Sequence, residues 1–261
     1  MGTATQNGEL WGVRARDWAD LQEGQSRECY AAVFDRLAVG TGTKLLDAGC
    51  GAGLAARLAA ARGAAVSGLD ASAALLAIAR ERLPAGDFRV GELEDLPFDA
   101  DSFDAVTGFN SFQYAADVPR ALREAMRVTR RGGAVVLLTW GPPEGMPAAT
   151  LVAALRPLMP PPPPGAPGPF ALSRENTLRD LITAQGLKPE VVADVPATFR
   201  YPDVPTGVRA LMTAGVAERV IRLVGPEAVA SAYREALATF VQADGACLVP
   251  AVFRYILARK P

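Results

Sequence analysis

Histidine is absent from the 261 residues, and this absence removes several kinds of catalytic chemistry at once. Without histidine there is no Ser-His-Asp or Cys-His triad, no H-E-x-x-H metal site and no histidine general base. Cysteine is scarce: Cys29, Cys50 and Cys247 lie far apart and form no C-x-x-C pair. This spacing argues against a disulfide framework or a zinc site. We therefore expect no metal site, and the cysteine usage favours a reducing, cytoplasmic environment.

The sequence also lacks an excess of either charge and any long apolar run. Lys and Arg number 27, and Asp and Glu number 28, so we expect neither nucleic acid nor an anionic membrane as a partner. No apolar stretch is long enough to cross a bilayer, and residues 1–10 lack the basic-then-apolar pattern of a secretory signal. Apolar side chains, in contrast, make up half of the chain, enough to form the core of one α/β domain.

After Gly40, short apolar segments alternate with helical ones. The predicted strands cover residues 44–48, 65–69, 88–90, 103–108 and 134–140. Ser72 and Asp117 are each placed to begin one of the helices between these strands, because their side chains can accept from free amides. Five strands alternating with helices predict a parallel sheet with right-handed crossovers and helices on both faces.

The flanking regions follow other patterns. Residues up to Gly40 read as helical, and the proline-rich stretch Pro157–Pro169, with its run Pro160–Pro164, predicts extended backbone. That stretch is interpreted either as a stiff spacer or as a rigid border of a substrate mouth. The remaining predictions are a helix capped by Ser173 and ending at Gln185, a strand over 191–195, helices within 206–241 and a final strand over 248–258. We divide the chain into a helical lid (1–40), a cofactor-binding core (41–140), a variable substrate or lid region (141–247) and the final core strand (248–261).

The turn Asp47-Ala-Gly49-Cys-Gly51-Ala-Gly53 joins the first predicted strand to its helix. Glycines at this spacing let the backbone approach a ligand closely. The dinucleotide pattern G-x-G-x-x-G would need glycine at position 54, which is Leu54, and Asp47 would repel a pyrophosphate. S-adenosylmethionine (SAM) has an ammonium group and no phosphate, so the turn favours SAM over NAD.

Acidic side chains also follow the second and third predicted strands. Asp70, followed by Ala71, lies where a ribose would be, and its carboxylate can accept from both ribose hydroxyls. After the third strand, the carboxylate of Glu92 can accept from an adenine amino group while the N–H of Leu93 faces a ring nitrogen. Their neighbours Glu94 and Asp95 are interpreted as solvated loop residues.

The segments LLDAGCGAG, GLDAS, GELEDLPF, SFDAV and RVTRRGGAVVL together resemble the motif series of class I SAM-dependent methyltransferases. The resemblance covers residues 44–140 and is strongest to the small-molecule group that includes ubiquinone and menaquinone biosynthesis methyltransferases. It implies a Rossmann-like, mostly parallel seven-stranded sheet with helices on both faces, in which the last strand is antiparallel. It also implies SAM-binding roles for Gly49 and Gly51 at the methionine portion, Asp70 at the ribose, Glu92 and Leu93 at the adenine, and Phe109 and Asn110 near the methionine end.

The acceptor side is less defined by the sequence. Methyl transfer needs alignment and exclusion of water more than it needs a base; if a base is needed, the candidates are Tyr114, Glu144 and Asp203. The aromatic side chains expected around the mouth, as a pocket for a flat or apolar acceptor, are Trp11, Trp18, Phe112, Tyr114, Trp140, Phe170, Phe199 and Tyr201.

We therefore expect a monomer or homodimer that methylates a small organic molecule, in specialised metabolism. Three alternatives remain open at this point. The first is a SAM-fold protein that catalyses another reaction, such as cyclisation, and the second is a protein that binds SAM or a metabolite without turnover. The third is an NAD-dependent oxidoreductase, which titration with SAM and NAD would separate from the other two.

Overall fold

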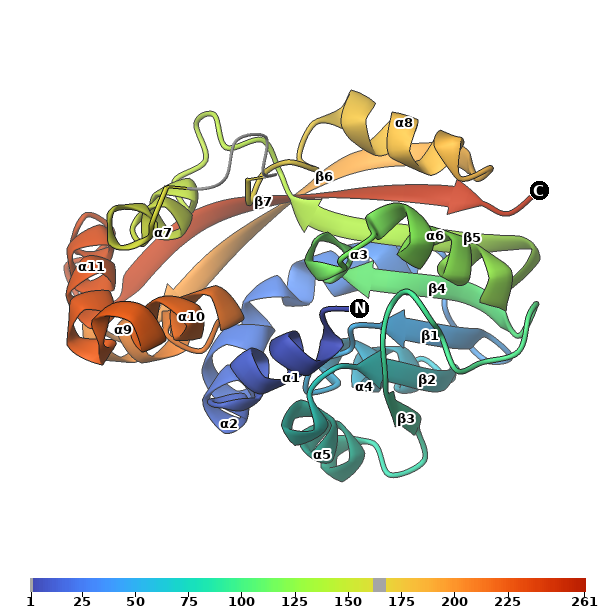
Figure 1. Cartoon of the computed structure of the whole chain (residues 1–261), viewed down its shortest axis with the longest axis horizontal. Coiled ribbons are helices and arrows are strands. Elements are labelled where there is room, and N and C mark those ends of the chain that lie inside the picture. Colours follow the sequence, from blue (N-terminus) through green and yellow to red (C-terminus); the bar gives the residue numbers. More distant parts are fainter. Residues whose placement is uncertain (1, 162–167) are drawn as a thin grey trace.

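A computed structural model describes residues 2–161 and 168–261, and a seven-stranded sheet runs through its centre (Figure 1). The strands are β1 (Lys44–Ala48), β2 (Ala65–Asp70), β3 (Asp87–Val90), β4 (Phe103–Phe109), β5 (Thr129–Trp140), β6 (Lys188–Tyr201) and β7 (Cys247–Arg259). They lie in the order β3-β2-β1-β4-β5-β7-β6. Strands β1 to β5 pair in parallel, and β7 is antiparallel to both of its neighbours. The predicted Rossmann-like sheet with an antiparallel last strand is thus confirmed.

Helices connect and cover these strands. They are α1 (Ala4–Gly12), α2 (Ala15–Asp17), the π-helical η1 (Trp18–Gln22), the 3-10 turn η2 (Glu23–Ser26), α3 (Arg27–Arg36), α4 (Leu54–Ala60), α5 (Ala73–Arg82), the 3-10 turn η3 (Phe112–Tyr114), α6 (Val118–Val128), α7 (Ala149–Ala153), the 3-10 turn η4 (Arg156–Leu158), α8 (Glu175–Ala184), α9 (Val204–Leu211), α10 (Gly215–Val224) and α11 (Pro226–Ala238). Ser72 and Asp117 cap α5 and α6 as predicted. The predicted cap Ser173 is wrong, because α8 begins at Glu175 and has no side-chain cap.

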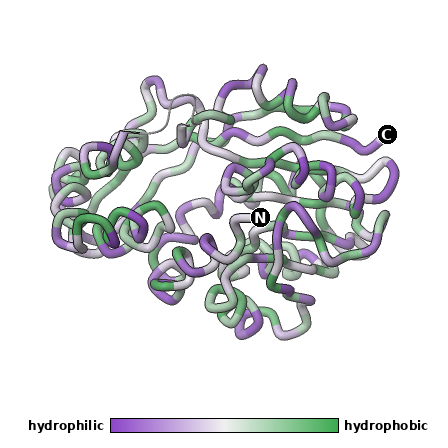
Figure 2. The backbone as a smooth tube through the Cα atoms, in the orientation of Figure 1, coloured by the Kyte–Doolittle hydropathy of each residue, from purple (hydrophilic) through white to green (hydrophobic). Residues whose placement is uncertain are grey.

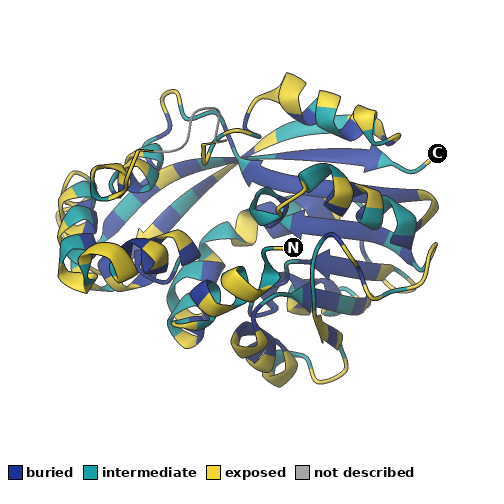
Figure 3. Cartoon of the chain, in the orientation of Figure 1, coloured by how far each residue is buried: buried dark blue, intermediate teal, exposed yellow. Residues whose placement is uncertain are grey.

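The two faces of the sheet are buried by different helices. Leu45 packs with α3 and α4 on one face, whereas its neighbour Leu46 packs with α6 and α8 on the other. Successive side chains of a strand point to opposite faces, so a strand covered on both sides must be apolar at every position. Figures 2 and 3 show the result: the central strands are apolar and buried, and the outer sides of the helices are exposed.

Strands β6 and β7 extend well beyond the parallel part of the sheet, and α7, α9, α10 and α11 gather around their far ends (Figure 1). The prediction for β6 covered only residues 191–195, because Pro189 and Pro196 interrupt the strand pattern. Proline is tolerated in edge strands and at bulges; β6 is at the edge of the sheet, and its register shifts between Pro189 and Val191.

Part of the proline-rich stretch lies outside the described residues. Within the run Pro160–Pro164, residues 162–164 lie outside them, so neither interpretation of this stretch is tested. Among the helices that are described, none is both long and apolar enough to cross a membrane. Within the same residues, no group of three Cys, Asp or Glu side chains is arranged to hold a metal ion.

Candidate functional site

The glycine turn after β1 has a backbone that only glycine adopts easily. Gly49, Gly51 and Gly53 have φ values of +83°, +54° and +78°, which strain any residue with a Cβ. A Cβ on Gly49 would also collide with the side chain of Ser111. The amides of Gly49 and Cys50 donate to the carbonyl of Leu69 at 2.7 and 3.0 Å. The turn is therefore held tightly against the end of β2.

Asp47, the acid that precedes this turn, is almost completely buried at 1% exposure. Its Oδ1 accepts from Thr107 Oγ1 at 3.1 Å, but its buried Oδ2 has no partner among the described residues. Burial raises the pKa of Asp47 to about 7; the carboxylates of Glu23 and Asp70 add to the rise, and the Thr107 hydrogen bond opposes it. A buried carboxylate oxygen without a donor favours a cationic or hydrogen-bonding ligand beside it.

A cavity of about 40 Å³ lies beside Asp47. Its walls are formed by Trp18, Glu23, Tyr30, Asp47, Gly49, Cys50, Gly51, Ala55 and Phe109. Two carboxylates and three aromatic rings thus surround one small space, an arrangement that favours positive charge. Sequence reasoning missed Glu23 and Tyr30, because both belong to N-terminal helices with no recognisable motif.

Glu23 fastens the N-terminal helices to the glycine turn. Its carboxylate is 4% exposed and accepts from the amide of Leu54 at 3.1 Å and from Arg82 Nη1 at 2.5 Å. The guanidinium of Arg82 also donates to the carbonyls of Ala52 and Ala19, both at 2.9 Å. Burial raises the pKa of Glu23, and the hydrogen bonds from Arg82 and Leu54 oppose that rise.

The structure brings the predicted acids together at the carboxyl ends of the parallel strands. Asp70 accepts from the amides of Gly51 and Ser72, both at 2.8 Å, and burial raises its pKa. Glu92, which follows β3, accepts from the amide of Ala4 at 3.3 Å. With Asp47, these carboxylates lie at the carboxyl ends of three neighbouring parallel strands, as the sequence predicts.

The interpretation of Glu94 as a solvated residue is wrong. Its side chain is 7% exposed, and Oε1 accepts from the amides of Ala116 and Asp117 at 2.6 and 3.1 Å. These amides precede α6 and would otherwise be without an acceptor. Asp95, interpreted in the same way, is exposed.

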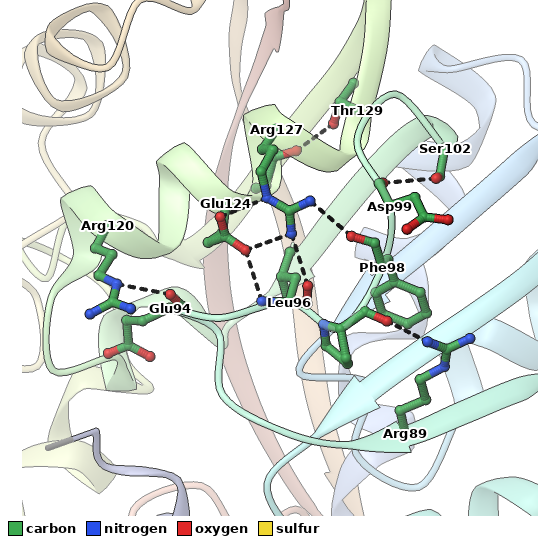
Figure 4. A network of polar contacts seen from close by, with 12 residues as sticks. Arg89, Glu94, Leu96, Phe98, Asp99, Ser102, Arg120, Glu124, Arg127 and Thr129 are labelled. Carbon is green, nitrogen blue, oxygen red and sulfur yellow. Dashed lines mark hydrogen bonds and ion pairs between the residues drawn. The ribbon is translucent and has the colours of Figure 1, made fainter.

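Helix α6 also holds the rest of this loop (Figure 4). Glu124 accepts from the amide of Leu96 at 2.9 Å and pairs with Arg127 at 2.7 Å. Arg127 in turn donates to the carbonyls of Leu96 and Phe98, both at 2.8 Å. The loop that carries Glu92 therefore has its backbone fixed by side chains from α6.

We expect Glu94→Ala to lower the free energy of unfolding by about 1–3 kcal/mol, because the amides of Ala116 and Asp117 lose their charged acceptor. Asp95→Ala is the matched control, since its exposed side chain should contribute no more than about 0.5 kcal/mol. Urea unfolding of both variants checks this. Equal stabilities would show that water replaces the Glu94 carboxylate without cost.

The predicted pocket aromatics fall into separate groups. Trp11 contacts Trp18 and Tyr114, with ring centroids 4.9 and 5.5 Å apart. Trp140 stacks on Phe253 at 4.8 Å and lies near two further aromatic residues, Phe170 and Phe199. The other two, Phe112 and Tyr201, are each 2% exposed; Tyr201 donates its hydroxyl to Gln22 Oε1 at 2.9 Å. The structure therefore does not gather all eight around one space.

The remaining candidates have different surroundings. Burial raises the pKa of Tyr114 to about 12, which keeps its hydroxyl protonated near neutral pH. Glu144 is exposed, and Asp203 is an exposed cap of α9 whose pKa is lowered by the amide of Thr206. Asn110, beside the turn, has a φ of +57°, a strained backbone that is common near ligand sites.

The glycine turn lies within the part of the chain that is similar to known proteins. Residues 46–137 match the family described as methyltransferase domain. The chain is 36% identical over 129 residues to the malonyl-acyl-carrier protein O-methyltransferase of Erwinia pyrifoliae, covering 49% of each protein. It is 42% identical over 102 residues to the demethylmenaquinone methyltransferase of Thermotoga maritima, covering 38% of this chain and 44% of that protein. The chain thus spans about half the length of these curated relatives.

Solved structures resemble the fold over a longer range. The structure of the 4+2 cyclase SpnF matches 99% of this chain and 97% of its own, with a TM-score of 0.65 and 20% identity. A geranyl diphosphate C-methyltransferase from Streptomyces coelicolor, solved with S-adenosyl-L-homocysteine, matches 89% of this chain and 75% of its own, with a TM-score of 0.53 and 20% identity. At such identities these matches show the fold alone.

Proposed function

We propose that the protein, whose residues 46–137 match the family described as methyltransferase domain, transfers a methyl group from SAM to a small organic acceptor. The observation that carries the proposal is the line of carboxylates Asp47, Asp70 and Glu92 at the ends of β1, β2 and β3. An ammonium group, two ribose hydroxyls and an adenine amino group all donate hydrogen bonds to carboxylates. The same edge would repel the phosphates of NAD.

The residues of the site fit this cofactor. In this proposal Asp47 Oδ2, which has no partner among the described residues, accepts from the ammonium group. Gly49 and Gly51 line the methionine portion, Asp70 accepts from the ribose, and Ala71, Glu92 and Leu93 surround the adenosine. Phe109 and Asn110 lie near the methionine end. When bound, the cofactor supplies an electrophilic methyl group on a sulfonium, whose positive charge the rings of Trp18, Tyr30 and Phe109 would stabilise.

The chain contributes mainly orientation and exclusion of water. Among the base candidates, Tyr114 is the one beside the N-terminal aromatics, but its raised pKa makes it a hydrogen-bond donor rather than a base. We therefore propose that the acceptor reacts through a nucleophilic atom that needs no deprotonation by the protein. The cluster of Trp140, Phe170 and Phe199 and the N-terminal cluster of Trp11 and Trp18 are the aromatic surfaces available to a flat acceptor, which we place in specialised metabolism.

The domain division follows from the same proposal. Residues 1–40 and 141–247 would form the lid and acceptor region around the core (41–140), completed by the final strand (248–261). Neither a nucleic acid nor a membrane is proposed as a partner, and the protein would act as a monomer or homodimer.

Isothermal titration of the purified protein with SAM, S-adenosylhomocysteine (SAH) and NAD tests the cofactor. We expect micromolar binding of SAM and SAH and none of NAD; NAD binding alone would overturn the proposal. Incubation with SAM and a panel of phenols, amines and carboxylic acids then tests turnover, with SAH measured by mass spectrometry.

A protein that binds SAM but catalyses a cyclisation is the second candidate, since the structure named as a 4+2 cyclase shares the fold over 99% of this chain. It predicts conversion of an acceptor without formation of SAH. SAH production in proportion to product would exclude it.

Asp70→Ala is expected to weaken SAH binding by about 1–3 kcal/mol, the usual cost of losing a charged hydrogen-bond partner. Asp70 also accepts from the amides of Gly51 and Ser72, so the variant should melt at a lower temperature. Asp70→Asn keeps one acceptor oxygen and separates the two effects. An SAH affinity unchanged in both folded variants would remove Asp70 from the site.

A further inference from the structure

Helix α1 lies on the residues that the proposed function assigns to adenosine. The amide of Ala4 donates to both carboxylate oxygens of Glu92 at 3.3 Å, and a Cβ on Gly2 would collide with that carboxylate. Thr3 Oγ1 and Asn7 Nδ2 donate to the carbonyl of Tyr114 at 2.9 and 3.1 Å. The start of the chain thus occupies the Glu92 carboxylate, the acceptor proposed for the adenine amino group.

The same helix covers the ribose end. A Cβ on Gly8 would collide with the carbonyl oxygen of Ala71, and one on Gly12 would lie 3.0 Å from Ser72 Oγ. Such close approach is possible because both helical residues are glycine. Figure 1 shows α1 beside the beginning of α5, directly after β2. At the contact between Gly8 and Ala71, no layer of ligand can lie between α1 and the chain that follows β2.

At the methionine end, the N-terminal residues leave only a small space. Trp18 Nε1 lies 3.5 Å from the position of a Cβ on Gly51, and Glu23 is hydrogen-bonded to the amide of Leu54. The cavity of about 40 Å³ is far below the roughly 300–1,000 Å³ of ordinary ligand pockets. A complete SAM molecule therefore does not fit this enclosed space, and the open groove of about 650 Å³ along α1 and Ala71–Ala74 is not lined by Asp47, Asp70 or Glu92.

We propose that residues 2–12, here called the strap, occupy the adenosine part of the cofactor site as an internal competitor, and that SAM binds only after the strap has moved away. This inference rests on the proposed function. The strap satisfies Glu92 with the amide of Ala4, and it places the backbone of Gly8 against the carbonyl of Ala71. Because strap and cofactor exclude each other, the apparent association constant for the cofactor is the intrinsic constant multiplied by the fraction of protein in the open state.

A disulfide between the strap and α5 tests the proposal. A Cβ on Gly12 would lie 3.6 Å from the Cβ of Ala74, within the usual range for a disulfide. The native cysteines are all buried, so they should not compete for pairing. We would make Gly12→Cys with Ala74→Cys, confirm the linkage by mass spectrometry, and titrate the oxidised and reduced forms with SAH. The two single variants are the controls.

We expect the oxidised double variant to bind SAH at least about 30-fold more weakly than its reduced form, with affinity restored by reductant. Equal affinities of the linked and reduced forms would overturn the strap proposal while leaving SAM binding intact. If the wild-type protein binds neither SAM nor SAH, the proposed function fails first, and the strap proposal fails with it.

A second variant tests the opposite direction without a covalent bond. Gly8→Ala favours the helical backbone but places a Cβ against the Ala71 carbonyl, so it should weaken the closed state without harming the helix. Gly24→Ala is the matched control, since nothing lies within 4 Å of its Cβ position. We expect SAH to bind Gly8→Ala about two- to tenfold more tightly than wild type. Weaker binding by Gly8→Ala, with Gly24→Ala unchanged, would show that the strap instead helps to hold the cofactor.

Discussion

Replacing Asp47 with asparagine is expected to weaken SAH binding by about 10- to 100-fold near pH 8, the usual range for loss of a charge-assisted hydrogen bond. The reason is that Asp47 Oδ2, a buried acceptor next to the cavity, has no partner in the described part of the chain. Asparagine keeps the size of the side chain but removes its charge. Isothermal titration checks the effect, with Asp99→Asn, an exposed carboxylate, as the control.

The same residue should make binding depend on pH. The pKa of Asp47 is about 7 because the side chain is buried, so below this pH the carboxyl carries a proton that must leave before it can pair with an ammonium group. SAH affinity should therefore fall by up to about tenfold for each pH unit below 7 in the wild type and much less in Asp47→Asn. A flat wild-type profile between about pH 5 and 8 would contradict this role.

Stability should change with pH in the opposite sense. The pKa of Asp47 is raised in the folded protein above its value of about 3.9 in an unfolded chain. The contribution of Asp47 to the free energy of unfolding is thus fully present below about pH 4 and is lost as pH rises through 7. Urea unfolding of the ligand-free protein should show this decline, and Asp47→Asn should reduce it.

Arg82→Met is expected to lower the free energy of unfolding by about 3 kcal/mol, because it leaves the buried Glu23 carboxylate without its counter-charge. The carbonyls of Ala19 and Ala52 also lose their donors. Urea unfolding measures the loss, which should be greater at high pH, where Glu23 is ionised.

Two further variants separate charge from packing at this ion pair. Adding Glu23→Gln to Arg82→Met should recover part of the lost stability, since no buried charge then remains. Arg16→Met breaks the ion pair with Glu81, whose two side chains are 58% and 59% exposed, and should cost no more than about 1 kcal/mol. Equal losses for Arg82→Met and Arg16→Met would show that water reaches Glu23 freely.

The core of the fold was predictable from local signals. Ser72 and Asp117 have side chains that cap the helices they precede, and the glycines after Asp47 occupy backbone that other residues avoid. Each of these signals lies within a few residues of the structure it determines. The same reasoning fails at Ser173, where a suitable cap residue is present but the helix begins two residues later at Glu175.

The misjudged side chains depend on partners far along the chain. Glu94 lies among other acids and resembles a solvated residue, yet the amides it accepts from are at positions 116 and 117. Glu23 and Tyr30 reach the cavity beside Asp47 only because the N-terminal helices fold back over the glycine turn. No periodicity or composition in the N-terminal region reports such a contact, so these residues could not be identified before the structure.

The long antiparallel ladder of β6 and β7 has a consequence for how the molecule can be divided. Residues 253–259 of β7 pair with β5 in the core, and residues 247–252 continue the same strand toward α7, α9, α10 and α11. A cut at residue 140 or 247 would separate hydrogen-bonded strands, so it would not yield two self-contained parts. Exchanging α7, α9, α10 and α11 between relatives should therefore succeed only when β6 and β7 are transplanted with them. The two strands and these helices form one exchangeable unit.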